Sequence, residues 1–223
     1  MSNANSPSPS SPAIISALLG LTFVTGIIDA VSLLSVGHVF VANMTGNVVF
    51  LGFALVHQGN VQATMVATAL SAFVAGALVG GKLAGAPLRL ARGFALELGL
   101  LILASALANT VPATAAATYV VVATLALAMG IRNALVRALA IPDMTTTVLT
   151  MAITGLAADS TIAGGHNQRW ERRSLAILAL AAGALCGALL LTHGARLAIP
   201  VSAALESLAV VLLLKGLSAH HTA

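Results

Sequence analysis

The sequence predicts an all-α integral membrane protein with six transmembrane helices plus two short re-entrant or broken helices, arranged as a 3+3 inverted repeat. Three observations lead to this fold class. Hydrophobic residues make up 59% of the 223-residue chain and charged residues 7%, whereas a soluble domain carries about 25% charged residues. The apolar residues form six long stretches and two short ones. The second half of the chain repeats the order of stretches in the first half.

The six long stretches are each expected to cross the membrane. A helix rises about 1.5 Å per residue and the hydrocarbon layer is about 30 Å thick, so roughly 20 apolar residues span it. Residues 1–12 are rich in Ser and Pro and are expected to be disordered, residues 13–216 to form one membrane domain, and residues 217–223 to form a polar tail. The long stretches are residues 14–36, 61–83, 93–109, 113–139, 174–192 and 197–214.

The two short stretches, residues 44–56 and 144–158, would reach only about 20 Å and 22 Å as helices. A helix that stops at mid-membrane depth is tolerated only where protein or a water-filled cavity surrounds its end. We therefore expect the two N-termini to meet near the membrane centre and to form a polar site there. The alternative is a pair of ordinary short or tilted helices whose caps only terminate them. The candidate caps are Asn43 or Thr45 for the first helix and Asp143 or Thr145 for the second.

Four short motifs recur in the second half of the chain in the same order. Any one of them is weak in a sequence rich in Ala, Gly and Leu, but four with similar offsets indicate an internal duplication of residues 13–110 and 113–216. Each half has three crossings, an odd number, so the second half is expected to be inverted. The matching segments are 26–30 with 130–134, 44–46 with 144–146, 76–80 with 183–187, and 95–97 with 204–206.

The basic residues favour six crossings over eight. If all eight stretches crossed, six basic residues would fall on one side and four on the other. If both short stretches enter and leave by the same face, nine lie on one side and only Arg196 on the other. The positive-inside rule then predicts that both termini lie in the cytoplasm. The nine residues are Lys82, Arg89, Arg92, Arg132, Arg137, Arg169, Arg172, Arg173 and Lys215.

Two segments resemble motifs of a known family. GIIDAVSLLSVGHVFVANMTGNVVFLG (residues 26–52) and IPDMTTTVLTMAITGLAADS (residues 141–160) resemble two motifs of the YoaK family of bacterial inner-membrane proteins. These are its Asp-containing first helix with a Met-Thr-Gly-Asn motif, and its Thr-rich second motif. The likeness covers roughly residues 14–215. Thr146 stands where the first half has Gly46, so the two short helices need not do the same job. The resemblance implies a multi-span membrane protein and no particular substrate.

Three acidic residues lie within the predicted spans, where a charge costs at least about 2.5–3.5 kcal/mol and usually has a partner or a role. Glu206 lies near the membrane centre and too far from Arg196 to pair with it. It is a candidate proton carrier or ligand contact, or a protonated acid that hydrogen-bonds a neighbouring helix. Asp29 either contributes to a site or braces the loop before the first short helix. Glu97 is expected to pair with Arg92 at the interface.

Other polar and small residues have two interpretations each. Arg132 either extends to the cytoplasmic interface or is the charge partner of a buried acid or an anionic substrate. The Thr-rich segment that starts at Thr145 can line a polar path or bond within the helices. Two Gly-x-x-x-Gly pairs permit close helix contact, either within the protomer or between the protomers of a homo-oligomer. These pairs are Gly76 with Gly80 and Gly183 with Gly187.

The leading functional hypothesis is a small secondary transporter or channel for a small polar or anionic solute, with proton coupling through Glu206 as one form of it. The alternative is a non-transporting membrane subunit or assembly factor of a larger complex. The sequence shows no catalytic motif and no metal-ligand spacing, so we expect no enzyme, cofactor, metal or nucleic-acid partner. The expected partners are the lipid bilayer and the solute. The candidate substrate- or ion-binding residues are Asp29, Asn43, Thr45, Asn47, Asn133, Thr145, Thr146 and Glu206, with Arg132 as a candidate charge partner.

Overall fold

The described part of the chain is built from helices. The computed structural model describes residues 12–58, 61–111, 114–141, 149–167, 169–193 and 195–221, and these residues contain no strand. Among them, six helices are long and apolar enough to cross a membrane and two are shorter, which confirms the predicted all-α membrane fold. The elements are α1 (Pro12–Val31), η1 (Ser32–Val36), α2 (Met44–Leu55), α3 (Ala63–Leu83), α4 (Pro87–Thr110), α5 (Ala115–Ala138), α6 (Leu149–Ala158), η2 (Thr161–Ala163), α7 (Trp170–Thr192) and α8 (Ala195–His221).

Two long helices extend beyond the apolar stretches that predicted them. α4 starts at Pro87, because proline is favourable in the first turn of a helix, and the exposed Arg89 and Arg92 continue the helix before its apolar part begins. α8 runs to His221, through residues that were expected to form a polar tail. It also contains Pro200 near its start. Hydropathy therefore predicted only the apolar centres of these helices, and charged and polar residues extend the helices beyond them.

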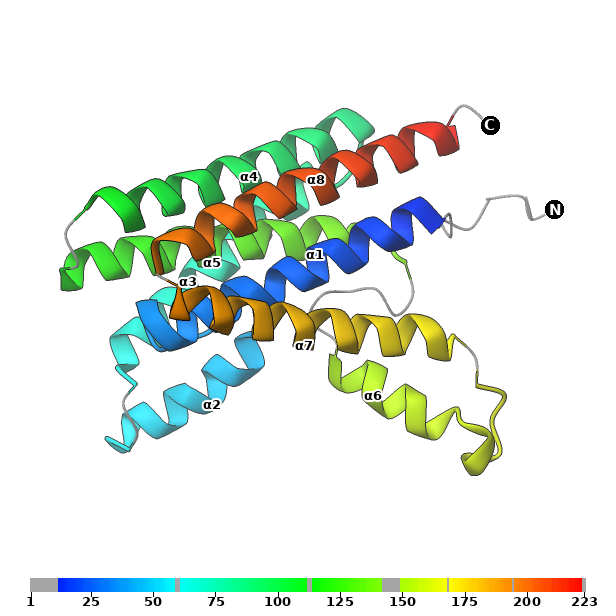
Figure 1. Ribbon diagram of the computed structural model, residues 1–223, viewed down its shortest axis with the longest axis horizontal. Coiled ribbons are helices and arrows are strands. Elements are labelled where there is room, and N and C mark those ends of the chain that lie inside the picture. The colour runs from blue at the N-terminus through cyan, green and yellow to red at the C-terminus, as the bar shows by residue number, and fades with distance from the viewer. Residues whose placement is uncertain are drawn as a thin grey trace.

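The long helices run along the long axis of the molecule, and the two described ends of the chain lie at the same end of it (Figure 1). α2 and α6 lie together on one side of the long helices. Each begins near the middle of the molecule, and they run toward opposite ends. The first turns of the two short helices are therefore close to each other, whereas their last turns are far apart.

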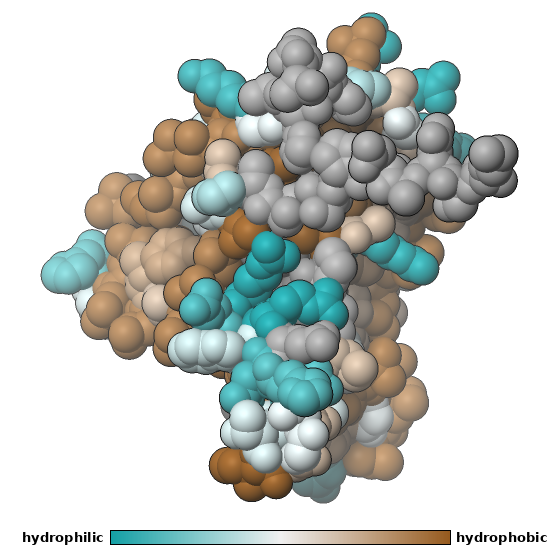
Figure 2. Space-filling view, turned by 90° about the vertical axis from the view of Figure 1, so that its right-hand side faces the viewer, coloured by the Kyte–Doolittle hydropathy of each residue, from teal (hydrophilic) through white to brown (hydrophobic). Residues whose placement is uncertain are grey.

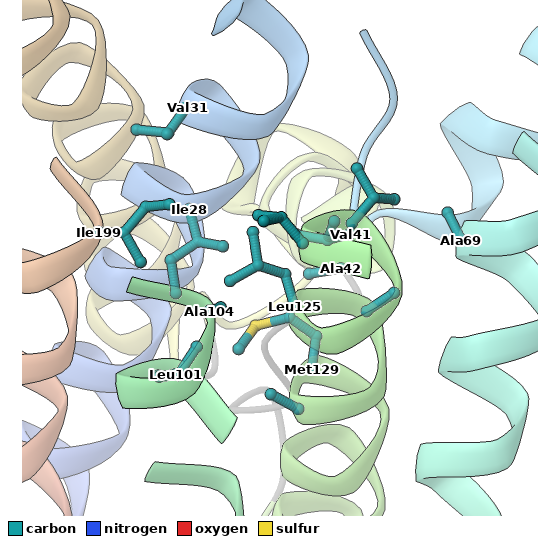
Figure 3. Packing of buried hydrophobic residues seen from close by; sticks show 14 of the residues in the cluster. Ile28, Val31, Val41, Ala42, Ala69, Leu101, Ala104, Leu125, Met129 and Ile199 are labelled. Carbon is teal, nitrogen blue, oxygen red and sulfur yellow. The ribbon is translucent and has the colours of Figure 1, made fainter. Parts of the chain in front are cut away.

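The centre of the molecule is formed by α1 and α5. In the apolar 18-residue stretch of each of these two spans 67% of the residues are buried, against 17% in the corresponding stretch of α7. Their side chains pack on α4, on α8 and on the segment between η1 and α2 (Figure 3). Ile28 of α1, Val41 before α2 and Leu125 of α5 belong to this core. Large apolar side chains such as Leu78 and Leu178 remain exposed, as expected of helices that face lipid.

The small-residue faces join helices of different halves within one chain. Gly183 of α7 lies against the backbone of Phe23 in α1, and Gly76 of α3 lies against the backbone of Leu127 in α5. A side chain at either glycine would overlap a carbonyl oxygen. These faces are therefore filled within the protomer, and the homo-oligomer that was predicted through them has no free glycine face to use.

The glycine contacts recur with the offsets found in the sequence. Gly26 packs on the backbone of Leu180, and Gly130 packs on the backbone of Phe73. The two glycines are 104 residues apart and their partners 107 residues apart, the same offsets as the matching motifs. At the level of whole helices, α1 packs on α7 and α8, and α5 packs on α3 and α4. Each half thus places its first helix against the last two helices of the other half.

The end of the molecule that carries the termini is rich in polar groups. α4 and α7 both begin there, and α5 ends there (Figure 1). Viewed from this side, hydrophilic residues gather across the face and hydrophobic residues flank them (Figure 2). The basic residues of these helix ends are Arg89, Arg92, Arg137, Arg172 and Arg173.

Replacing Gly130 with alanine should lower the stability of the protein. The new Cβ atom would overlap the carbonyl oxygen of Phe73, so α3 and α5 must move apart, which typically costs about 1–3 kcal/mol or more. Thermal unfolding in detergent measures the loss. Gly99→Ala is the matched control, because no atom lies within 4 Å of the added methyl group and alanine favours a helix. An equal melting temperature for the two variants would contradict the close packing.

Candidate functional site

A cavity of about 530 Å³ lies between α1, α7 and the first turns of the two short helices. Its wall is mostly apolar, with a small number of polar side chains. Such a mixture is typical of small-molecule sites, where apolar walls provide contact and a few polar groups give orientation. Among the residues that the structure describes, the polar side chains that line it are Thr25, Asp29, Asn43, Thr45 and Thr150.

Asp29 holds the segment between η1 and α2 in place. One carboxylate oxygen accepts hydrogen bonds from the backbone N–H groups of Val41 (2.9 Å) and Ala42 (2.8 Å). The other accepts from the N–H group of Asn43 at 3.1 Å. The side chain is nearly buried and still lines the cavity. The sequence left two roles open for Asp29, and these hydrogen bonds show that it braces the loop. Asp29 also forms part of the cavity wall.

The backbone needs this support because α1 does not end in a simple cap. The helix continues into the π turn η1, in which the N–H group of Gly37 bonds to the carbonyl oxygen of Ser32 at 3.0 Å. His38 then adopts a left-handed conformation with φ of 54°. The following residues are buried but not helical, so their N–H groups require other acceptors. Asp29 supplies these acceptors one turn before η1.

Asn43 and the Met-Thr-Gly-Asn motif that follows it (residues 44–47) contact both the cavity and the loop before α2. Asn43 caps α2, its side-chain oxygen accepting from the N–H group of Gly46 at 3.4 Å. Thr45 and Gly46 line the cavity. Asn47 is fully buried and bonds both backbone groups of Phe40, with its side-chain oxygen 2.9 Å from the nitrogen and its side-chain nitrogen 2.6 Å from the oxygen. Asn47 was a predicted binding residue, but in the structure its polar atoms lock the loop.

For the second short helix, fewer of the predicted site residues can be compared with the structure. Thr145 and Thr146, both predicted site residues, lie outside the described residues. Within α6, Thr150 lines the cavity together with Leu149 and Ile153. Asn133 is half-buried in α5 and donates a hydrogen bond to the carbonyl oxygen of Met129 at 2.8 Å. It does not belong to the described cavity lining.

A second polar group lies behind the cavity, within the packed helices. Arg132 of α5 is fully buried and forms ion pairs with Glu97 of α4 and Glu206 of α8, both of which are also fully buried. Its guanidinium also donates to the hydroxyl of Thr25 at 2.9 Å and to the carbonyl oxygen of Leu21 at 3.2 Å. One oxygen of each glutamate has no hydrogen-bond partner. The cluster therefore joins α1, α4, α5 and α8 through one guanidinium.

This cluster decides what the sequence left open about three residues. Glu206 was expected to be unpaired, but it pairs with Arg132. Glu97 was expected to pair with Arg92 at the interface, but it is buried and also pairs with Arg132. Of the two interpretations of Arg132, extension to the interface is wrong because its side chain is fully buried, and its predicted role as the charge partner of a buried acid is confirmed. Sequence distance could not reveal these pairs, since Arg132 is 35 residues from Glu97 and 74 from Glu206 and only the packing of three helices brings them together.

Thr25 links the cluster to the cavity. Its hydroxyl accepts the hydrogen bond from Arg132 and donates one to the carbonyl oxygen of Leu21 at 2.9 Å. The same residue lines the cavity. The ion cluster is thus one side chain away from the cavity wall. Among the described residues, no group of three or more His, Cys, Asp or Glu side chains is arranged to hold a metal ion.

Comparison with known proteins decides the family. The profile of the family described as "Protein of unknown function (DUF1275)" matches residues 17–213. The chain is a member of the DUF1275 family. The "UPF0700 transmembrane protein YoaK" of Bacillus subtilis (strain 168) is 32% identical to the chain over 152 residues. That alignment covers 64% of the chain and 65% of the relative.

The YoaK-family resemblance of the two motifs is thereby confirmed. No solved structure matches the chain. The DUF1275 profile covers α2 to α7 and most of α1 and α8, so both short helices lie within the family match. The cavity between them therefore lies in the part of the chain that the family shares.

Replacing Asp29 with alanine should release the loop before α2. Three N–H groups would lose their acceptor, and leaving such buried groups unpaired costs about 2–3 kcal/mol. Hydrogen exchange of residues 37–43, followed by mass spectrometry, should become faster, and the melting temperature should fall. Ser35→Ala is the control, because its hydroxyl bonds only within its own helical turn. Unchanged exchange in Asp29→Ala would show that the carboxylate does not hold this segment.

Replacing Arg132 with methionine should destabilise the protein strongly, because it leaves two buried carboxylates without their cation. Breaking a buried ion pair in this way typically costs about 3–5 kcal/mol. Unfolding in detergent gives the free-energy difference, and Arg137→Met on the same helix, where the side chain is exposed, is the control. Replacing Glu97 and Glu206 with glutamine in the Arg132→Met protein should recover much of the loss. A variant with Arg132→Met alone that is as stable as the wild type would contradict the role of the cluster.

Proposed function

We propose that the chain is a small secondary transporter or channel of the bacterial cytoplasmic membrane. The observation that carries this proposal is the cavity of about 530 Å³ at the first turns of α2 and α6. A small polar solute would bind there, between the hydroxyl, amide and carboxylate groups of Thr45, Asn43 and Asp29. The chain would act by binding and passing this solute, without catalysing a reaction.

The two short helices support the proposal because of where they begin. Non-helical backbone at membrane depth is stable only where protein or a water-filled cavity surrounds it. The segment before α2 meets this requirement through Asp29 and Asn47. Helices that start near the bilayer centre, with a solute site at their N-termini, are a common construction of secondary transporters. We accordingly treat α2 and α6 as re-entrant helices.

The repeated contacts support an inverted repeat. Gly26 and Gly130 make equivalent contacts with α7 and α3, and α2 and α6 run toward opposite ends of the molecule. Two halves of opposite orientation would present the site to each side of the membrane in turn, as alternating access requires. The positive-inside rule makes the basic end cytoplasmic, which would place both termini in the cytoplasm.

The observation that suggested proton coupling through Glu206 does not hold in the structure. The sequence presented this residue as an acid without a partner near the membrane centre, whereas the structure pairs it with Arg132. Glu206 also does not belong to the described lining of the cavity. The proposal therefore does not depend on Glu206.

Filling the cavity should reduce flux. Val49 lines the cavity and the neighbouring Val48 does not, although both side chains are exposed, so tryptophan at each position forms a matched pair. Purified protein in liposomes, followed by stopped-flow light scattering, measures the entry of glycerol, urea, ethanolamine and acetate. We expect Val49→Trp to slow the entry of at least one solute by about tenfold and Val48→Trp to leave it near the wild-type rate.

Empty liposomes are the reference for this measurement. If wild-type protein transports none of these solutes faster than empty liposomes, the panel lacks the substrate or the protein does not transport. A wider panel of small metabolites that also gives no flux would favour the alternative of a non-transporting membrane subunit. Equal flux through Val49→Trp and Val48→Trp would exclude the cavity as the route.

A further inference from the structure

We infer that the cavity selects cations over anions, so that its solute is a small organic cation such as a protonated amine. This inference rests on the proposed function and narrows its substrate class. It departs from the anionic solute considered from the sequence. The sign of the charge around the cavity carries the inference, and three contributions to it can be read from the structure.

The first contribution is the charge of the lining itself. Among the lining residues that the structure describes, Asp29 is the one with a charged side chain. Its two oxygens accept three backbone N–H bonds, which fix the side chain at the wall. Thr45, Asn43 and Thr150 add dipoles but no net charge. The charge of the described lining is negative, so it would repel an anion that enters the cavity.

The second contribution is the N-terminus of α2, which by itself would favour an anion. A helix N-terminus acts as roughly half a positive charge. The Asp29 carboxylate binds the three N–H groups that immediately precede α2, and Asn43 caps the N–H group of Gly46. A full negative charge therefore lies directly at this partial positive charge. The sum is about half a negative charge, so the helix end does not reverse the preference.

The third contribution comes from the two arginines that are buried among the described residues, Arg132 and Arg173. Arg132 reaches Thr25, but its charge is matched by two carboxylates, Glu97 and Glu206. Arg173 of α7 pairs with Asp159 at 2.6 Å beside α6. Neither guanidinium is available to an anion in the cavity. The described surroundings of the cavity therefore provide no positively charged side chain without a carboxylate partner.

The apolar part of the wall suits an organic cation better than a hydrated metal ion. Leu33, Phe40, Val49 and Leu180 line the same space. Alkyl groups gain from contact with such side chains, whereas a small metal ion would lose its water without gaining enough oxygen ligands. An ammonium group can remain near Asp29 while its carbon atoms contact the apolar wall.

The test measures charge preference directly and does not depend on flux. In a Cys186→Ala background, Val49→Cys places a thiol in the cavity and Val48→Cys places one outside it. Purified proteins in liposomes are treated with trimethylammonioethyl methanethiosulfonate, a cation, or sulfonatoethyl methanethiosulfonate, an anion. We expect the ratio of cationic to anionic reaction rates to be about tenfold higher at Val49→Cys than at Val48→Cys, the size expected of one charge acting over several ångströms.

Two further variants connect this ratio to Asp29. Adding Asp29→Asn should bring the ratio at Val49→Cys close to that at Val48→Cys. Because this change also weakens the loop, Thr45→Lys is tested as well, since it adds a positive charge to the lining and leaves Asp29 intact. It should lower the ratio below that of the Val48→Cys control.

The outcomes separate this inference from the proposed function. Equal ratios at the two positions, or faster reaction of the anionic reagent in the cavity, would overturn the cation preference while leaving a water-accessible cavity. No reaction of Val49→Cys with either reagent would show that the cavity is closed to water and would remove both proposals. A high ratio that disappears with Asp29→Asn and Thr45→Lys supports the inference, even where the flux assay fails.

Discussion

The carboxylate of Asp29 meets the main constraint on this fold, which is that backbone N–H groups inside a membrane need acceptors. Between η1 and α2 the chain turns and starts a new helix, so several N–H groups leave the helical pattern. Asp29 accepts from three of them, and Asn47 pairs with the backbone of Phe40. Thr45, Gly46 and the cavity owe their positions to this arrangement. The charge that holds the loop is also the charge that a solute in the cavity would meet.

Arg132 plays the corresponding part in the packed interior. Its guanidinium joins α4 and α8 through their glutamates and α1 through Thr25 and the Leu21 carbonyl. A guanidinium with its planar set of donors can serve several acceptors at once, which lysine cannot do in the same geometry. Glu97 and Glu206 occupy matching positions in the sequence repeat, and in the structure they converge on one residue. The contact between the halves is thus polar at this point and apolar in the core around Leu125.

Hydropathy and helix length were enough to predict the six spans and the two short helices, because each depends on neighbouring residues alone. The same holds for Asn43 as the cap of α2 and for the close contacts of Gly76 and Gly183. The sequence could not show that Glu97 and Glu206 share Arg132, since that contact depends on how α4, α5 and α8 pack. It also assigned Asn47 to the site, because a polar residue at membrane depth looks the same whether it binds a ligand or the chain. The direction of a side chain is a tertiary property, and local pattern does not contain it.

The first helix of each half packs against the last two helices of the other half, and this has a consequence for how the protein assembles. α1 is synthesised before α7 and α8, which are its main packing partners. Until they are made, Gly26 lacks the backbone of Leu180 against which it packs. α1 therefore reaches its final packing only after α7 and α8 have been synthesised.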